Sequence, residues 1–231
     1  MDSTALTLGG FLGTGLVLGL RHSLDPDHVM AVTAIVSRTR SLKSSTLVGA
    51  AWGLGHAFTL LLAGIVVLGL KLTIPAGIAD IFEGIVAAAL IALGTVTVIR
   101  ARKDRIHLHA HDHDGKAHVH LHAHAATAGH AHGHMPFFIG MVHGLAGSAA
   151  LTILAMGAAT SLASGLLFIA VFGLGAMLGM LATSTLIGAP LLFASKYARL
   201  AAAMPLAAGA ASVVLGVVML THLTGVLPAR L

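Results

Sequence analysis

The chain has 231 residues, of which 57% are hydrophobic and only 9% are charged, with a net charge of +5. A soluble domain carries roughly 25% charged residues, so this composition cannot build a water-facing surface and instead predicts a protein partnered by the lipid bilayer. The basic balance does not indicate a nucleic-acid partner, because the Lys and Arg residues fall in short segments between apolar runs, as they do in membrane proteins.

The apolar runs predict transmembrane helices. In lipid every backbone amide must be bonded within the protein, which leaves helices or closed barrels. Runs of about 20 residues fit helices, whereas barrel strands would alternate over roughly 10. We therefore predict an all-α integral membrane fold with six transmembrane helices near residues 5–36, 46–70, 76–99, 136–160, 165–193 and 204–227.

The first span is interrupted by the polar string RHSLDPDH. Pro26 has no N–H and its ring clashes with the carbonyl of His22, so the helix should break near residues 22–26. Asp25 can then cap a second helix that begins at Pro26. Such a break would let His22, Asp27 and His28 converge, as in the discontinuous helices of transporters. The alternative is an extramembrane loop with solvated charges, but the apolar stretches on either side are short for complete spans.

Charged groups at this depth need partners, an aqueous cavity or a ligand, since each costs roughly 3 kcal/mol at the membrane centre. We expect Arg21 to pair with Asp25 or Asp27. His56 lies in the middle of the second span, where a lone His is often a packing residue, but the nearby cluster favours a ligand. His143 occupies the fourth span. The chain has no Cys, and imidazole with carboxylate suits nickel, cobalt or zinc. The predicted metal ligands are His22, Asp25, Asp27, His28, His56 and His143.

A polar segment from residue 107 to residue 134 holds eleven of the sixteen His residues. It is too poor in apolar mass to form a packed core, so we expect it to lack stable structure without metal. Alternating imidazoles can bind divalent ions at neutral pH, as a buffer, sensor or acceptor, or incidentally. The chain thus divides into a first three-helix unit (1–99), a His-rich loop (100–134) and a second three-helix unit (135–231).

The distribution of Lys and Arg predicts the topology. Ten of these residues fall in the loops on one side of the six predicted spans and two on the other. The positive-inside rule makes the ten-charge side cytosolic, with the His-rich loop in the cytosol and both termini outside. The start of the chain has no basic region typical of a cleaved signal peptide. We expect the inner (cytoplasmic) membrane of a bacterium or archaeon.

A weak internal repeat relates the two three-helix units. LGLRHSLD (18–25) resembles IGMVHGLA (139–146), and WGLGHA (52–57) resembles FGLGAM (172–177), at offsets of 121 and 120. Three spans per unit would insert the second copy upside down, so we predict an inverted 3+3 repeat. His143 corresponds to His22, whereas Asp25, Asp27 and His28 correspond to Ala146, Ser148 and Ala149. Any metal site is therefore asymmetric and built mainly from the first unit.

These motifs resemble those of the nickel/cobalt transporter family (NiCoT) and its shorter urease-accessory, UreH-like relatives. RHSLDPDH matches the family's H-x-x-x-x-D-H hallmark, and Leu54, Gly55 and His56 match part of the second motif, L-G-H-S-T. The later Asp-Thr motifs of the family are not visible, and GMVHGLAGSAA stands in their place. The resemblance implies transport of Ni²⁺ or Co²⁺, and a related group of exporters carries a long His loop.

From these patterns we predict a secondary permease that takes up Ni²⁺ or Co²⁺, with Zn²⁺ as a further candidate, and not an enzyme. No prosthetic group is expected, and a cytosolic metallochaperone is a candidate partner. Three alternatives remain: an exporter with the His-rich loop as collector, an intramembrane zinc enzyme, and a metal store. The enzyme alternative lacks a His-Glu-x-x-His motif and the sequence has no ATP-binding motif.

Overall fold

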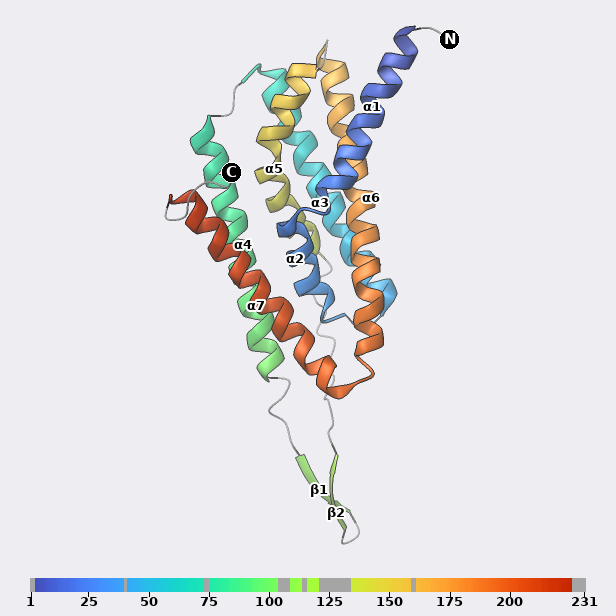
Figure 1. The fold of residues 1–231 in the computed structure, drawn as a ribbon, viewed down its shortest axis with the longest axis vertical. Coiled ribbons are helices and arrows are strands. Elements are labelled where there is room, and N and C mark those ends of the chain that lie inside the picture. Colours follow the sequence, from blue (N-terminus) through green and yellow to red (C-terminus); the bar gives the residue numbers. More distant parts are fainter. Residues whose placement is uncertain are drawn as a thin grey trace.

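The computed structural model describes residues 3–39, 41–72, 75–103, 109–113, 116–120, 134–158 and 161–225. This part of the chain forms seven α-helices and one β-hairpin (Figure 1). The helices are α1 (Ser3–His22), α2 (Pro26–Val36), α3 (Leu42–Gly69), α4 (Ala76–Lys103), α5 (Met135–Ala158), α6 (Leu162–Ala194) and α7 (Ala198–Leu223), and the strands are β1 (His109–His113) and β2 (Lys116–His120).

The predicted helix break is confirmed, because α1 ends at His22 and α2 begins at Pro26. Pro26 occupies the first turn of α2, where a missing N–H costs nothing. Asp25 stands at the N-cap position with extended backbone, but its side chain makes no capping hydrogen bond. The Asp25 carboxylate forms a hydrogen bond with His22 instead.

Among the residues that the structure describes, four helices are long and apolar enough to cross a membrane by length and composition: α3, α4, α6 and α7. At 1.5 Å per residue the 28 residues of α3 span about 42 Å, which exceeds a hydrocarbon core of roughly 30 Å. The predicted all-α membrane class agrees with these helices. The count of six spans stays a prediction.

The contacts among the helices place the short helix α2 in the interior of the bundle. α3 packs against α5 and α6, α1 packs along α6, and α4 pairs with α7. The short α2 touches α3, α4, α6 and α7, and Ala31, Val32 and Ala34 are fully or almost fully buried. α2 follows the break directly and lies among the longer helices (Figure 1), and within its first turn Pro26 is exposed, Asp27 is partly buried and His28 is buried.

Glycines allow the close helix crossings, as is common in membrane bundles. A Cβ at Gly19 would meet the carbonyl oxygen of Phe172, and a Cβ at Gly140 would meet that of Trp52. Gly140 and Phe172 lie 121 and 120 residues after Gly19 and Trp52, so the two crossings have the spacing of the sequence repeat. The crossing of α1 with α6 thus has a counterpart in that of α5 with α3.

The helix starts show a second such pair. Ser41 caps α3 by accepting from the backbone N–H of Ser44, and Ser161 caps α6 by accepting from that of Ser164. These two caps are 120 residues apart. The N-terminal Ser satisfies backbone donors that the first helical turn leaves unpaired.

The expectation that the His-rich segment lacks structure is wrong for ten of its residues. β1 and β2 pair antiparallel, with His109 opposite His120 and His113 opposite Lys116. The hairpin projects beyond one end of the bundle (Figure 1), which is called the hairpin end below. An alternating sequence pairs readily because strands repeat every two residues, although a two-stranded hairpin alone is only marginally stable.

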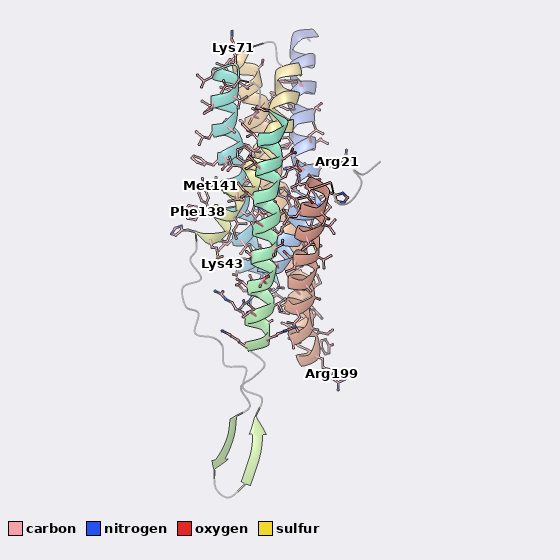
Figure 2. The ribbon with its side chains drawn as sticks, turned by 90° about the vertical axis from the view of Figure 1, so that its left-hand side faces the viewer. Arg21, Lys43, Lys71, Phe138, Met141 and Arg199 are labelled. Atoms are coloured by element: carbon pink, nitrogen blue, oxygen red, sulfur yellow. The ribbon has the colours of Figure 1, made fainter. Side chains whose placement is uncertain are left out.

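Three basic residues lie at different positions along the long axis of the bundle. Figure 2 shows Arg199 toward the hairpin end, Lys71 at the opposite end, and Arg21 between them. Arg21 is the residue before His22, at which α1 ends, so the break lies between the two ends of the bundle and not at either end (Figure 2).

Candidate metal centre

Four imidazoles meet beside the helix break. His22 is the last residue of α1 and His28 lies in the first turn of α2, and their ring centroids are 4.6 Å apart. On an unbroken helix the two would lie roughly 120° apart around the axis. The break therefore does what the sequence predicts, since it turns both rings toward one point.

His56 and His143 complete this imidazole cluster from other helices. His56, in the middle of α3, has its ring centroid 5.2 Å from that of His22 and 5.1 Å from that of His28. His143, on α5, lies 5.3 Å from His28. His28, His56 and His143 are 2%, 0% and 1% exposed. The cluster thus joins residues from both sequence units at one buried place.

Hydrogen bonds fix the orientation of three of the four rings. His22 Nδ1 lies 2.7 Å from Asp25 Oδ2, and His28 Nδ1 lies 3.0 Å from Asp27 Oδ1. His143 Nδ1 lies 3.1 Å from the carbonyl oxygen of Ile139. A ring that donates from Nδ1 keeps the Nε2 lone pair free, which is the arrangement found around metal-bound histidines.

The free nitrogens are buried and have no hydrogen-bond partner among the described residues. They are Nε2 of His22, His28 and His143 and both ring nitrogens of His56. A buried polar atom without a partner costs about 1–3 kcal/mol, so five such atoms in one place indicate a site shaped for a ligand. Imidazole donors with no thiolate suit Ni²⁺, Co²⁺ or Zn²⁺.

Two groups of side chains could each hold an ion, and they share His28. One is His22, His28 and His56, and the other is Asp25, Asp27 and His28, each with its ligand atoms within 4.8 Å of one another. The first group is the better candidate, because its nitrogens are unpartnered while both carboxylates already bond imidazoles. The structure thus brings all six predicted residues together, with Asp25 and Asp27 placed behind the rings.

The expected ion pair of Arg21 is wrong. Both carboxylates pair with imidazoles, and within the part of the chain that the structure describes no ion pair joins Arg21 to Asp25 or Asp27. The direction of the side chains explains the choice, because Arg21 and His22 both lie about one turn before Asp25 but Arg21 is exposed on α1 whereas His22 is partly buried.

The sequence interpretation missed Trp52, whose ring lies 4.8 Å from that of His143. Trp52 is fully buried, and it stands four residues before His56 on α3, so it occupies the same helix face one turn away. This spacing within WGLGHA was the available signal. Trp52 forms a wall of the site beside His143.

The fold and this cluster define an α-helical membrane protein with a candidate metal centre. The chain is similar to the urease accessory protein UreH of Bacillus sp. (strain TB-90), with 35% identity over 206 residues that cover 89% of this chain and 88% of the relative. It belongs to the UreH family of urease accessory proteins. No protein-family profile matches the chain, and no solved structure matches it.

Proposed function

We propose that the protein is a permease that carries Ni²⁺ or Co²⁺ across the membrane through the imidazole cluster, with uptake as the direction. The observation that carries the proposal is the convergence of His22, His28 and His56 with unpartnered nitrogens inside the bundle. The urease accessory name of the relative also points to nickel. Zn²⁺ fits the same donors and stays a further candidate.

The protein would bind the ion with neutral imidazole nitrogens and would not change it chemically. Asp25 and Asp27 would hold the rings of His22 and His28 and offset the charge of the ion. No prosthetic group is needed for this task. On the uptake hypothesis a cytosolic metallochaperone would receive the ion.

We also propose the topology that supports uptake. Six spans would result if α1 and α2 together cross once and α3 to α7 each cross once, with the hairpin end in the cytosol. The counterpart crossings of Gly19 with Phe172 and Gly140 with Trp52 support an inverted 3+3 repeat. Inverted repeats with a site at a broken helix are a common plan of secondary transporters.

The test is time-resolved accumulation of radiolabelled Ni²⁺ in cells that express the intact chain or a variant. The His22→Ala, His28→Ala double variant removes two of the three ligands, and His222→Ala on α7 serves as a control histidine outside the cluster. We expect the intact chain and the control to accumulate more Ni²⁺ than the double variant.

Other outcomes identify the alternatives. Lower accumulation with the intact chain than with the double variant would indicate an exporter that collects metal on its His-rich segment. Equal metal binding and transport by the intact chain and the double variant would refute the site. If replacement of the loop histidines by Ser abolished all effect on cellular metal while the cluster variants did not, the protein would be a metal store.

A further inference from the structure

We propose that His143 is a transfer ligand that takes the ion from the His22 side of the cluster toward the hairpin end, with His28 holding the ion during the passage. The inference rests on the proposed transport function. It divides the cluster into a first position, made of His22, His28 and His56, and a second position at His28 and His143.

His28 contacts the rings of both positions, and the candidate ligand groups separate the two positions. His28 lies 4.6 Å from His22 and 5.3 Å from His143 between ring centroids. Neither of the two groups that could each hold one ion includes His143, and the all-imidazole group consists of His22, His28 and His56. One ion in the first position therefore leaves His143 without a role, yet His143 keeps Nδ1 on a backbone carbonyl and Nε2 buried and unpartnered. Such an atom is costly unless a ligand visits it.

The two positions follow each other along the bundle axis. The ring of His143 lies beside Trp52, which is one turn closer than His56 to the start of α3. On α5, a Cβ at Gly147 would lie 3.3 Å from His22 Nε2, and Gly147 follows His143 by one turn. One helical turn is about 5.4 Å. His143 therefore lies about one turn from His22 in the direction in which α3 begins and α5 begins.

The side chains of His22 and His143 differ in their exposure. His22 is 20% exposed by its side chain, whereas His143 is 1% exposed. Between the cluster and the start of α3, α3 and α6 are joined by hydrogen bonds, from Ser184 Oγ to the carbonyl oxygen of Ser45 at 2.6 Å and between the hydroxyls of Thr46 and Thr185 at 3.0 Å. Nε2 of both His22 and His143 is buried, so the greater exposure of the rest of the His22 side chain is the feature that marks the His22 side as the side of entry in this proposal.

The repeat gives a reason for this pairing. His22 and His143 are 121 residues apart, the spacing that also relates Gly19 to Gly140 at the counterpart helix crossings. In an inverted repeat the two-fold operation exchanges the two ends of the protein. The role that His22 has toward one end then falls to His143 toward the other, while His28 and His56 have no histidine counterpart and serve both positions.

The experiment uses a matched pair, His143→Gln and His143→Glu, in the full chain. Gln and Glu have the same shape and similar reach, but only the Glu carboxylate is a good ligand for the ion. Ni²⁺ binding to purified protein is measured by calorimetry in a common background with the eleven histidines of residues 107–134 replaced by Ser, and Ni²⁺ transport is measured in cells. Thermal unfolding confirms that each variant folds.

We expect His143→Gln to bind Ni²⁺ within about threefold of the parent, because the first position is intact, and to transport it about tenfold more slowly or worse. His143→Glu should recover part of the transport. Transport by His143→Gln at the parental rate would overturn the inference, and so would a lack of recovery with His143→Glu. A loss of Ni²⁺ binding by His143→Gln as large as that of His28→Ala would also overturn it, because His143 would then be a ligand of a single site. A parent that neither binds nor transports Ni²⁺ or Co²⁺ would instead refute the proposed function, and this inference with it.

Discussion

Replacement of Asp27 by Ala should weaken Ni²⁺ binding about 10–100-fold, the usual effect of losing a carboxylate that orients a metal-bound histidine, which corresponds to about 1.4–2.7 kcal/mol. Asp27 Oδ1 lies 3.0 Å from His28 Nδ1, and the Asp27 side chain is only 22% exposed. His28 belongs to both candidate ligand groups. Loss of its orienting partner should therefore affect every ion that enters the site.

The same change at Asp25 should have a smaller effect. Asp25 Oδ2 is closer to its imidazole, at 2.7 Å from His22 Nδ1, but the Asp25 side chain is 50% exposed. Water screens an exposed pair, so the expected loss is about tenfold or less.

Asp27→Asn keeps an oxygen that can accept the hydrogen bond from Nδ1 of His28 while removing the charge. Its affinity should fall between those of the parent and Asp27→Ala.

The assay is Ni²⁺ titration of the purified full chain in the background with Ser in place of the loop histidines, so that only the buried site reports. The order of affinities should be parent, then Asp25→Ala, then Asp27→Ala. A loss of about a thousandfold or more at Asp27 would exceed any orienting effect and make the carboxylate a direct ligand. A change of less than about twofold would show that packing alone holds His28.

Three further variants test the fold and the cluster. Gly175→Ala puts a Cβ against a carbonyl of α1 and should destabilise the protein by about 1–3 kcal/mol in thermal unfolding, whereas Gly69→Ala, with nothing within 4 Å, should not; equal effects would contradict the packing argument. Ser184→Ala loses a buried 2.6 Å hydrogen bond to α3 and should cost about 0.5–1.5 kcal/mol, in contrast to the exposed Ser195→Ala control. His56→Leu should abolish Ni²⁺ binding without lowering the stability of the metal-free protein, because both ring nitrogens lack partners; reduced stability with intact binding would make His56 a packing residue.

The broken helix could be predicted because its causes are local. Pro26 acts on a carbonyl four residues earlier, and this rule needs no knowledge of the rest of the chain. The choice of partner for Asp25 is also local but finely balanced, since Arg21 and His22 both lie within one turn. Here the sequence interpretation chose Arg21 and the structure has His22. The direction in which each side chain faces decided the outcome.

The amino-acid sequence by itself determined the membrane class, the helical fold and the break, because composition and short-range spacing control these features. The six metal-site residues that it predicts stay a prediction, although the structure brings them together. Only the tertiary structure decided which ring nitrogens are free, that His143 lies against His28 and Trp52, and that His143 falls outside the group that could hold one ion. These facts depend on how α1, α2, α3 and α5 pack. The packing of helices far apart in the chain depends on the shapes of whole helix surfaces, which no local pattern contains.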